Sequence, residues 1–187
     1  MAVTTSTNVS ATVYAKIIET LIIAYQYDEA TARGHAEALV PLLQKCLQAL
    51  DGGLQSVHKI AVCVGPGSFT GLRVGLSAAR ALGLAAGVPV VGVTSLSAYA
   101  APHIIAGTTL SIATLIDARH GNAYCQCVTG GGRMLIAPVR MAVSEIIEIL
   151  NRSGGVKVVG DVCRNRQQPT WSFFNTVSQH PASTKNP

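Results

Sequence analysis

Four residues of a glycine-rich turn, Gly65, Pro66, Gly67 and Ser68, have the composition of a loop that binds phosphate. A glycine turn that opens a helix offers backbone N–H groups and the positive end of the helix dipole to an anion. The motif GPGSFTG does not match the G-x-G-x-x-G motif. It is not a P-loop either, because it lacks the Lys-Ser/Thr pair. We therefore interpret it as a candidate phosphate-facing turn and not as a defined nucleotide site.

His35 and Glu37 suggest a metallopeptidase, but their spacing does not support one. The HExxH motif places a glutamate directly after the first histidine and a second histidine four residues on. Ala36 and Leu39 occupy those positions here. A helix-surface histidine without a ligand role is the better interpretation, and no metal site is expected.

Asp117 and Arg119 follow a predicted strand, at a place where functional sites often gather. We interpret them as a salt-bridged or capping pair in a turn rather than as catalytic residues.

The cysteines indicate buried, reduced thiols rather than a disulfide framework or a metal site. They are odd in number and contain no CxxC pair. The five positions are Cys46, Cys63, Cys125, Cys127 and Cys163.

A strand and a helix position the glycine turn. Residues 60–64 are an unbroken apolar run, typical of a strand buried on both faces. Residues 69–86 are predicted to form a helix that Ser68 or Thr70 caps. One face of this helix is nearly free of side chains, so another backbone can approach it closely: Gly71, Gly75, Ala79 and Gly83. A polar stripe lies on another side: Arg73, Ser77 and Arg80.

A second amphipathic helix is predicted over residues 31–50. Its apolar positions follow helical spacing: Ala36, Leu39, Leu43, Cys46, Leu47 and Leu50. Leu42 widens this surface, and Pro41 predicts a kink or a break. Together with helix 69–86 it offers more apolar or small-residue surface than one sheet contact needs. We expect the two helices to form a partner-binding face; packing of the small-residue stripe on the chain's own sheet is the alternative.

The remaining predicted elements include two sets of three strands, one in each half of the chain. Strands are predicted over residues 2–5, 10–16 and 21–27, and again over 110–118, 123–129 and 134–139. Further strands are expected at 88–93 and 156–160, and helices at 95–103 and 144–150. Two halves with the same order of elements indicate an internal duplication.

Composition excludes some classes of protein. Hydrophobic residues make up 49% of the 187 residues and charged ones only 12%, so much of the chain must be buried in a core or against a partner. No window of about 18 apolar residues lacks a charge, and the N-terminus lacks the pattern of a secretory signal. The net charge of +5 is not concentrated in a basic run, so it does not indicate a nucleic-acid-binding surface.

The run GPGSFTGLRVG, followed by AARALGLAAGVPVVGVTSL, resembles the TsaB (YeaZ) family of bacterial tRNA-modification proteins, glycoprotease-like paralogues of TsaD. The similarity extends from residue 2 to about residue 161. TTSTNVSATVY resembles the family's opening strand, HAEALVPLL its first long helix and IDARHGNAY the start of its second half. The resemblance implies an actin-like, ribonuclease-H-like duplicated α/β fold, two lobes with mixed sheets flanked by helices, here with a shortened second lobe.

The resemblance also implies a non-catalytic partner subunit that supports threonylcarbamoyl transfer to adenosine 37 of tRNA. The activity, ATP and a metal are expected on a TsaD-type partner, with a TsaE-type ATPase in the complex. This chain is expected to be cytoplasmic, to form a homodimer when alone, to contact tRNA only indirectly and to need no cofactor in isolation. Family members pair through the two helices, so the partner-binding residues are expected to be His35, Leu39, Leu42, Leu43, Gly71, Arg73, Gly75, Ser77, Ala79 and Arg80.

Thr4 departs from the family pattern, which has aspartate there in the sequence DTST. A threonine cannot supply the charge that holds a hard cation. An actin-like ATPase or sugar-kinase-type enzyme would need a carboxylate at this position, and a metallopeptidase would need a ligand set that includes His35. These two enzyme classes are the alternatives to a scaffold.

Three domains are expected: a first lobe over residues 1–103, a smaller second lobe over 104–163 and an irregular tail over 164–187. The tail is polar, lacks helical periodicity and holds Trp171, Phe173 and Phe174. These aromatic residues are expected to cover an edge of the second lobe, or the tail is loosely attached.

Overall fold

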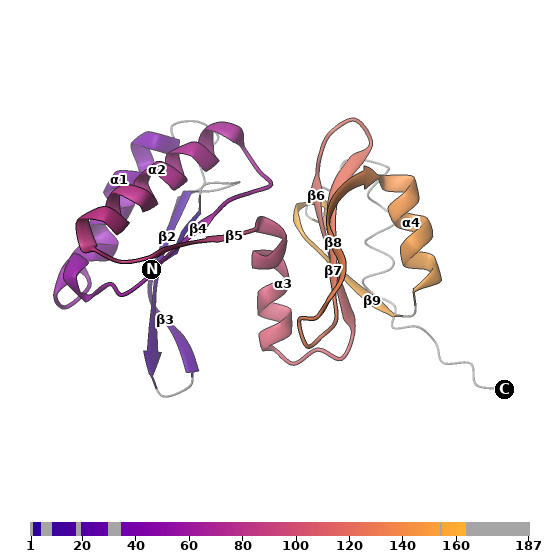
Figure 1. The fold of residues 1–187 in the computed structure, drawn as a ribbon, viewed down its shortest axis with the longest axis horizontal. Coiled ribbons are helices and arrows are strands. Elements are labelled where there is room, and N and C mark those ends of the chain that lie inside the picture. Colours follow the sequence, from indigo (N-terminus) through magenta and orange to yellow (C-terminus); the bar gives the residue numbers. More distant parts are fainter. Residues whose placement is uncertain (1, 5–8, 18–19, 30–34, 154, 164–187) are drawn as a thin grey trace. The chain divides into compact units, whose positions relative to one another are not determined.

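The computed structural model describes residues 2–4, 9–17, 20–29, 35–153 and 155–163. The chain divides into two compact units, residues 1–95 and 96–187 (Figure 1). The predicted boundary between residues 103 and 104 lies within a helix of the second unit, and the predicted tail lies outside the described residues. The three domain limits stay a prediction.

The first unit contains a five-stranded sheet in the order β3-β2-β1-β4-β5. Its strands are β1 (Ala2–Thr4), β2 (Val9–Ile17), β3 (Thr20–Glu29), β4 (Ile60–Cys63) and β5 (Val90–Val93). The first three strands are antiparallel neighbours, whereas β4 runs parallel to β1 and β5 runs parallel to β4. The predicted opening meander and the two strands after it are confirmed. The prediction that residues 60–64 are buried on both faces is wrong, because Ile60 and Val62 are buried whereas Ala61 and Cys63 between them are half-buried.

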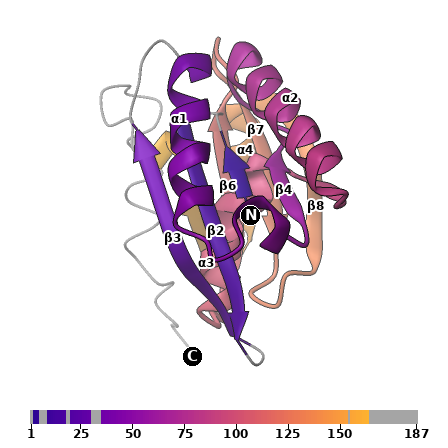
Figure 2. The same cartoon turned by 90° about the vertical axis from the view of Figure 1, so that its left-hand side faces the viewer.

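Helices α1 (His35–Gln48) and α2 (Phe69–Ala86) cover one face of this sheet, as Figure 2 shows, and the short 3-10 helix η1 (Gly53–Ser56) follows α1. The prediction for α2 is correct at both ends, because both ends carry local capping signals. Ser68 accepts a hydrogen bond from the N–H of Gly71 at the start, and Gly87 adopts the left-handed conformation, φ 66°, at the end.

The predicted break at Pro41 is absent, since α1 runs through this residue as one helix. Proline removes one backbone hydrogen bond, a cost that burial of neighbouring side chains can offset. Pro41 itself is exposed, whereas Leu39, Leu42 and Leu43 beside it are buried.

The small-residue stripe of α2 packs on the chain's own sheet. Gly71, Gly75, Ala79 and Gly83 are all buried. A Cβ atom added at Gly83 would collide with Cγ2 of Val90 on β5. Ala79 shares a core cluster with Ile60 and Val62 of β4. Of the two alternatives open for the stripe, the structure therefore supports close packing within the chain.

The second unit contains a four-stranded sheet in the order β8-β7-β6-β9. Its strands are β6 (Ser111–Asp117), β7 (Asn122–Val128), β8 (Met134–Ala142) and β9 (Val156–Val159). Strands β6, β7 and β8 form an antiparallel meander, and β9 runs parallel to β6. The order repeats the β3-β2-β1-β4 part of the first sheet, so the predicted duplication is confirmed in the topology.

Helices α3 (Ser95–Ile105) and α4 (Val143–Arg152) lie on opposite faces of the second sheet (Figure 1). The main core lies under α4, where Ile146 and Leu150 pack against Leu115 and Cys125. On the other face, Ala100 and Ile104 of α3 pack against Ile112. The short 3-10 helix η2 (Asp161–Cys163) follows β9.

Candidate functional site

A shallow groove of about 580 Å³ runs between α1 and α2. Leu39 of α1 and Val74 and Ala78 of α2 line it, and its rim includes Val40 and Phe69. The groove exists because two amphipathic helices share the same face of the first sheet and meet along their apolar sides. It lies on the two helices that the sequence predicts as a partner-binding face.

Three leucines predicted to face the partner are buried: Leu39 forms part of the groove's lining, and Leu42 and Leu43 are not among its lining residues. Leu39, Leu42 and Leu43 are 0, 5 and 6% exposed. They form one cluster with Cys46 and pack against partly buried residues of α2, among them Val74. These leucines hold the two helices together.

The rim of the groove carries exposed apolar surface. Phe69, the first residue of α2, is 74% exposed and Val40 is 54% exposed. The guanidinium carbon of Arg73 lies 5.3 Å from the centroid of the Phe69 ring, which is cation–π geometry. An aromatic ring left in water beside a stacked arginine is typical of a contact residue at a protein interface.

The polar stripe of α2 lies on its outer side, as predicted. Arg73, Ser77 and Arg80 are all exposed. Leu84 continues the same side at 87% exposure and, with Arg80, lines a second hollow of about 490 Å³. By contrast, Gly71, Gly75 and Ala79 face the sheet and are absent from this surface.

His35 is the first residue of α1, and its side chain lies outside the described ones. Its predicted role on the partner-binding face stays a prediction. Thr4 is the last residue of β1 and pairs with Ser10 of β2.

The glycine turn is fixed by Ser95, the first residue of α3, which the sequence analysis does not single out. Ser95 donates from its N–H to the carbonyl oxygen of Gly65, at 2.8 Å, and from its hydroxyl to the carbonyl oxygen of Pro66, at 2.7 Å. The Sγ of Cys63 lies 2.9 Å from the Ser95 hydroxyl, which accepts from this thiol because its own proton is committed to Pro66. Ser68 uses its hydroxyl to cap α2.

Within the first unit, this network ties the turn to Cys63 at the end of β4 and to Ser95. Gly65 is buried with φ 102°, whereas Gly67 and Ser68 are exposed. The role of this turn toward a phosphate stays a prediction.

Asp117 and Arg119 form a capped turn at one end of the second sheet, as predicted. The N–H of Arg119 donates to Oδ1 of Asp117 at 2.8 Å, and the N–H of Asp117 donates to Oδ1 of Asp161 at 2.9 Å. Burial raises the pKa of Asp161, although the backbone N–H groups of Asp117 and Val162 oppose this. The contact between Asp117 and Arg119 is a backbone cap and not a salt bridge between side chains.

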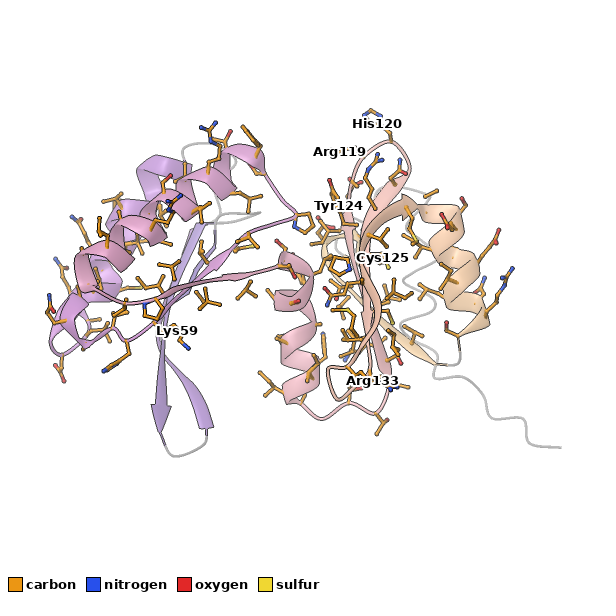
Figure 3. The ribbon with its side chains drawn as sticks, viewed as in Figure 1. Lys59, Arg119, His120, Tyr124, Cys125 and Arg133 are labelled. Atoms are coloured by element: carbon orange, nitrogen blue, oxygen red, sulfur yellow. The ribbon has the colours of Figure 1, made fainter. Side chains whose placement is uncertain are left out.

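The tip of this hairpin presents Arg119 and His120 (Figure 3). Both residues have positive φ, 63° and 53°, and Gly121 follows with 72°. The amide of Asn122 donates to the carbonyl oxygen of His120 at 3.0 Å, which holds the turn closed. Arg133 lies at the other end of the sheet, on the connection between β7 and β8.

The described cysteines are free thiols, as predicted. Cys46, Cys125 and Cys127 are buried and Cys63 is half-buried. Burial raises the pKa of all three buried thiols, that of Cys125 to about 11 with a further contribution from Cys127. These three thiols therefore stay protonated at neutral pH and are poor nucleophiles.

Within the described residues, no group of three or more side chains is placed to hold a metal ion. In the same part of the chain, every helix is too short or too polar to cross a membrane.

A family model for TsaD, described as tRNA N6-adenosine threonylcarbamoyltransferase, matches residues 20–176. The tRNA threonylcarbamoyladenosine biosynthesis protein TsaB of Escherichia coli is 33% identical over 96 residues, 51% of this chain and 42% of that protein. A tRNA N6-adenosine threonylcarbamoyltransferase of Tropheryma whipplei is 46% identical over 72 residues, 38% of this chain and 18% of that protein. The chain thus spans less than half the length of both relatives.

Among solved structures, YeaZ from Pseudomonas aeruginosa superimposes with a TM-score of 0.62 at 23% identity. The match covers 76% of this chain and 66% of that one. It agrees with the two sheets of repeated strand order, which make the fold actin-like. By the family model and these matches, the chain belongs to the family of TsaD and TsaB (YeaZ) proteins.

Proposed function

We propose that this chain is a non-catalytic subunit that binds a TsaD-type protein and supports threonylcarbamoyl transfer to adenosine 37 of tRNA. Membership of the TsaD and TsaB family supports the process. The observation that carries partner binding is the groove between α1 and α2, with Phe69 and Arg73 exposed together on its rim. When a partner covers this rim, its apolar surface is removed from water, which favours association.

The chemistry is assigned to the partner. Thr4 ends the first strand, where the family pattern has an aspartate, and a hydroxyl does not supply the charge that a magnesium ion requires. ATP and metal are therefore proposed on the TsaD-type protein, with a TsaE-type ATPase completing the complex. The proposal includes a cytoplasmic location, a homodimer in isolation and only indirect contact with tRNA.

The test separates partner binding from catalysis. Phe69→Ala removes the exposed ring, and we expect the complex with the TsaD-type protein to weaken at least tenfold in isothermal titration. Leu135→Ala on β8 is the matched control, since it removes another large apolar side chain that is 49% exposed. Modification of tRNA is expected to fall at limiting concentrations of the variant and to recover at saturating ones, because a binding defect is overcome by mass action.

Two results would contradict the proposal. One is a Phe69→Ala complex of unchanged affinity together with unchanged modification of tRNA. The other is hydrolysis of ATP by the purified chain alone that Thr4→Ala abolishes.

A further inference from the structure

We propose that the outer side of α2 recognises a partner surface rich in carboxylates, so that this chain binds its TsaD-type partner in preference to a second copy of itself. The inference rests on the proposed function and adds the chemistry of the partner's contact surface. It concerns five residues that we name the α2 outer stripe: Phe69, Arg73, Ser77, Arg80 and Leu84.

The α2 outer stripe is one continuous side of the helix. Its members are separated by three or four residues, the spacing of neighbours on a helix surface. Phe69 and Leu84 supply apolar area at the two ends, with exposures of 74 and 87%. Arg73 and Arg80 supply two cations between them, and both are exposed.

The described charged side chains of α1 and α2 are all positive. Helix α2 contains no acidic residue, and the part of α1 from Leu39 to Gln48 adds only Lys45. Glu37 is in the first turn of α1, outside the described side chains, and Asp51 lies in the turn beyond the helix. Across the described part of the chain, neither Arg73 nor Arg80 has a carboxylate within salt-bridge distance.

A symmetric dimer would place this stripe against its own copy. In a two-fold interface the same patch contributes from both subunits, so Arg73 and Arg80 would be present twice, and the described side chains of α1 and α2 would add no carboxylate to offset them. Like charges brought together while they lose water disfavour association. A partner that presents carboxylates instead forms charge-assisted hydrogen bonds with both guanidinium groups.

The groove adds a second requirement for the partner. Apolar Leu39, Val74 and Ala78 line it together with polar Thr70, Arg73 and Ser77, so it accepts an apolar side chain that has polar neighbours. Stacking on Phe69 holds the guanidinium of Arg73 at the rim of this groove. An arginine that is oriented before binding loses less conformational freedom when it pairs with a carboxylate.

The experiment measures two affinities at two salt concentrations. Sedimentation equilibrium gives self-association, and isothermal titration gives binding to the TsaD-type protein of the same organism, each at about 50 and about 500 mM NaCl. We expect the complex with the TsaD-type protein to weaken at least tenfold in high salt. Self-association is expected to stay the same or to strengthen, because salt screens the repulsion between the stripes.

Charge reversal adds an independent comparison. Arg73→Glu and Arg80→Glu are each expected to weaken binding to the TsaD-type protein at least tenfold, whereas an equimolar mixture of wild type and Arg80→Glu should associate more tightly than wild type alone. Arg133→Glu is the matched control, an exposed arginine of the second unit with the same change of charge. Arg73→Gln and Arg80→Gln serve as milder variants if circular dichroism shows that a reversal disturbs the fold.

The outcomes distinguish this inference from the proposed function. Binding to the TsaD-type protein that is insensitive to salt and to both arginine substitutions overturns the carboxylate preference and leaves the partner role intact. A homodimer tighter than the complex with the TsaD-type protein also overturns it. Absence of binding to the TsaD-type protein under every condition overturns the proposed function itself.

Discussion

The hydroxyl of Ser95 donates a hydrogen bond to the carbonyl oxygen of Pro66 across 29 residues of sequence. Ser95 is 3% exposed and Pro66 is half-buried, so removal of the hydroxyl takes this hydrogen bond from a carbonyl group that is only partly open to water. We expect Ser95→Ala to lower the free energy of unfolding by about 1–3 kcal/mol, the usual cost when a polar group inside a protein loses its hydrogen-bond partner. Urea denaturation measures the change, with Ser144→Ala at an exposed position of α4 as the control. A change no larger than that of the control would mean that the turn does not depend on this bond.

Close packing of Gly83 against β5 gives a second prediction. Alanine is a better helix former than glycine by about 1 kcal/mol, so an exposed helical glycine would gain stability from the change. At Gly83 the added methyl group would collide with Val90 and approach the carbonyl oxygen of Val88 to 3.2 Å. We therefore expect Gly83→Ala to destabilise the protein by about 1–3 kcal/mol.

Ser77→Ala on the exposed side of α2 serves as the control for this second prediction, because it changes helix propensity without adding a contact. Thermal unfolding of both variants followed by circular dichroism gives the comparison. A rise in Tm for Gly83→Ala would show that α2 can move away from the sheet at little cost.

The limits of α2 were predictable because its signals are local. Ser68 and Gly87 bracket the helix, and their capping roles depend on residues within one turn. The order of elements along the chain was predictable for a related reason, since turn residues separate the short strands of each meander. The Asp117 turn was also predictable, because its cap spans two residues.

The faces of the helices were not predictable from periodicity. Leu39, Leu42 and Leu43 mark an apolar side of α1, but the pattern does not say whether that side meets another chain or, as observed, α2. The role of Ser95 was missed because its partners lie far away in sequence, and no local motif signals such a contact. The outer residues Phe69 and Leu84 were missed because an apolar residue inside an apolar helix does not reveal its exposure.

Thr114 provides a third prediction. It is fully buried on β6, directly opposite Gln126 of β7, and its Oγ1 atom has no hydrogen-bond partner in the part of the chain that the structure describes. Valine has nearly the same shape and no hydroxyl to desolvate. We expect Thr114→Val to raise the free energy of unfolding by about 1 kcal/mol. Thr109→Val, at an exposed position before β6, is the control in the same urea titration. A destabilised Thr114→Val protein would reveal a hydrogen bond made by this hydroxyl.

The raised pKa of Asp161 predicts how stability depends on pH. Burial favours the protonated carboxyl in the folded state, so the folded protein binds this proton more tightly than the unfolded chain does. The stabilisation from Asp161 is therefore complete below the ordinary pKa of 3.8 and is lost as pH rises through the folded pKa. Asp161→Asn keeps an oxygen that accepts from the N–H of Asp117, and we expect its advantage over wild type to appear and grow above pH 3.8.

Denaturation of both proteins across this pH range measures the difference. Asp51→Asn, in the exposed turn after α1, controls for the loss of one negative charge. If Asp161→Asn is less stable than wild type by the same amount at every pH, the hydrogen bonds of the carboxylate contribute more free energy than its burial costs.

The strand order of the second sheet also predicts the order in which the strands of this unit fold. Strands β6, β7 and β8 follow one another in the chain, whereas β9 must return over α4 to pair with β6. Short chain closures form faster than long ones because less entropy is lost before the first contacts are made. We expect pulsed hydrogen exchange during refolding to protect Leu115 and Cys125 before Val158. On the ribosome, the meander would be complete before the last strand of the sheet has been synthesised.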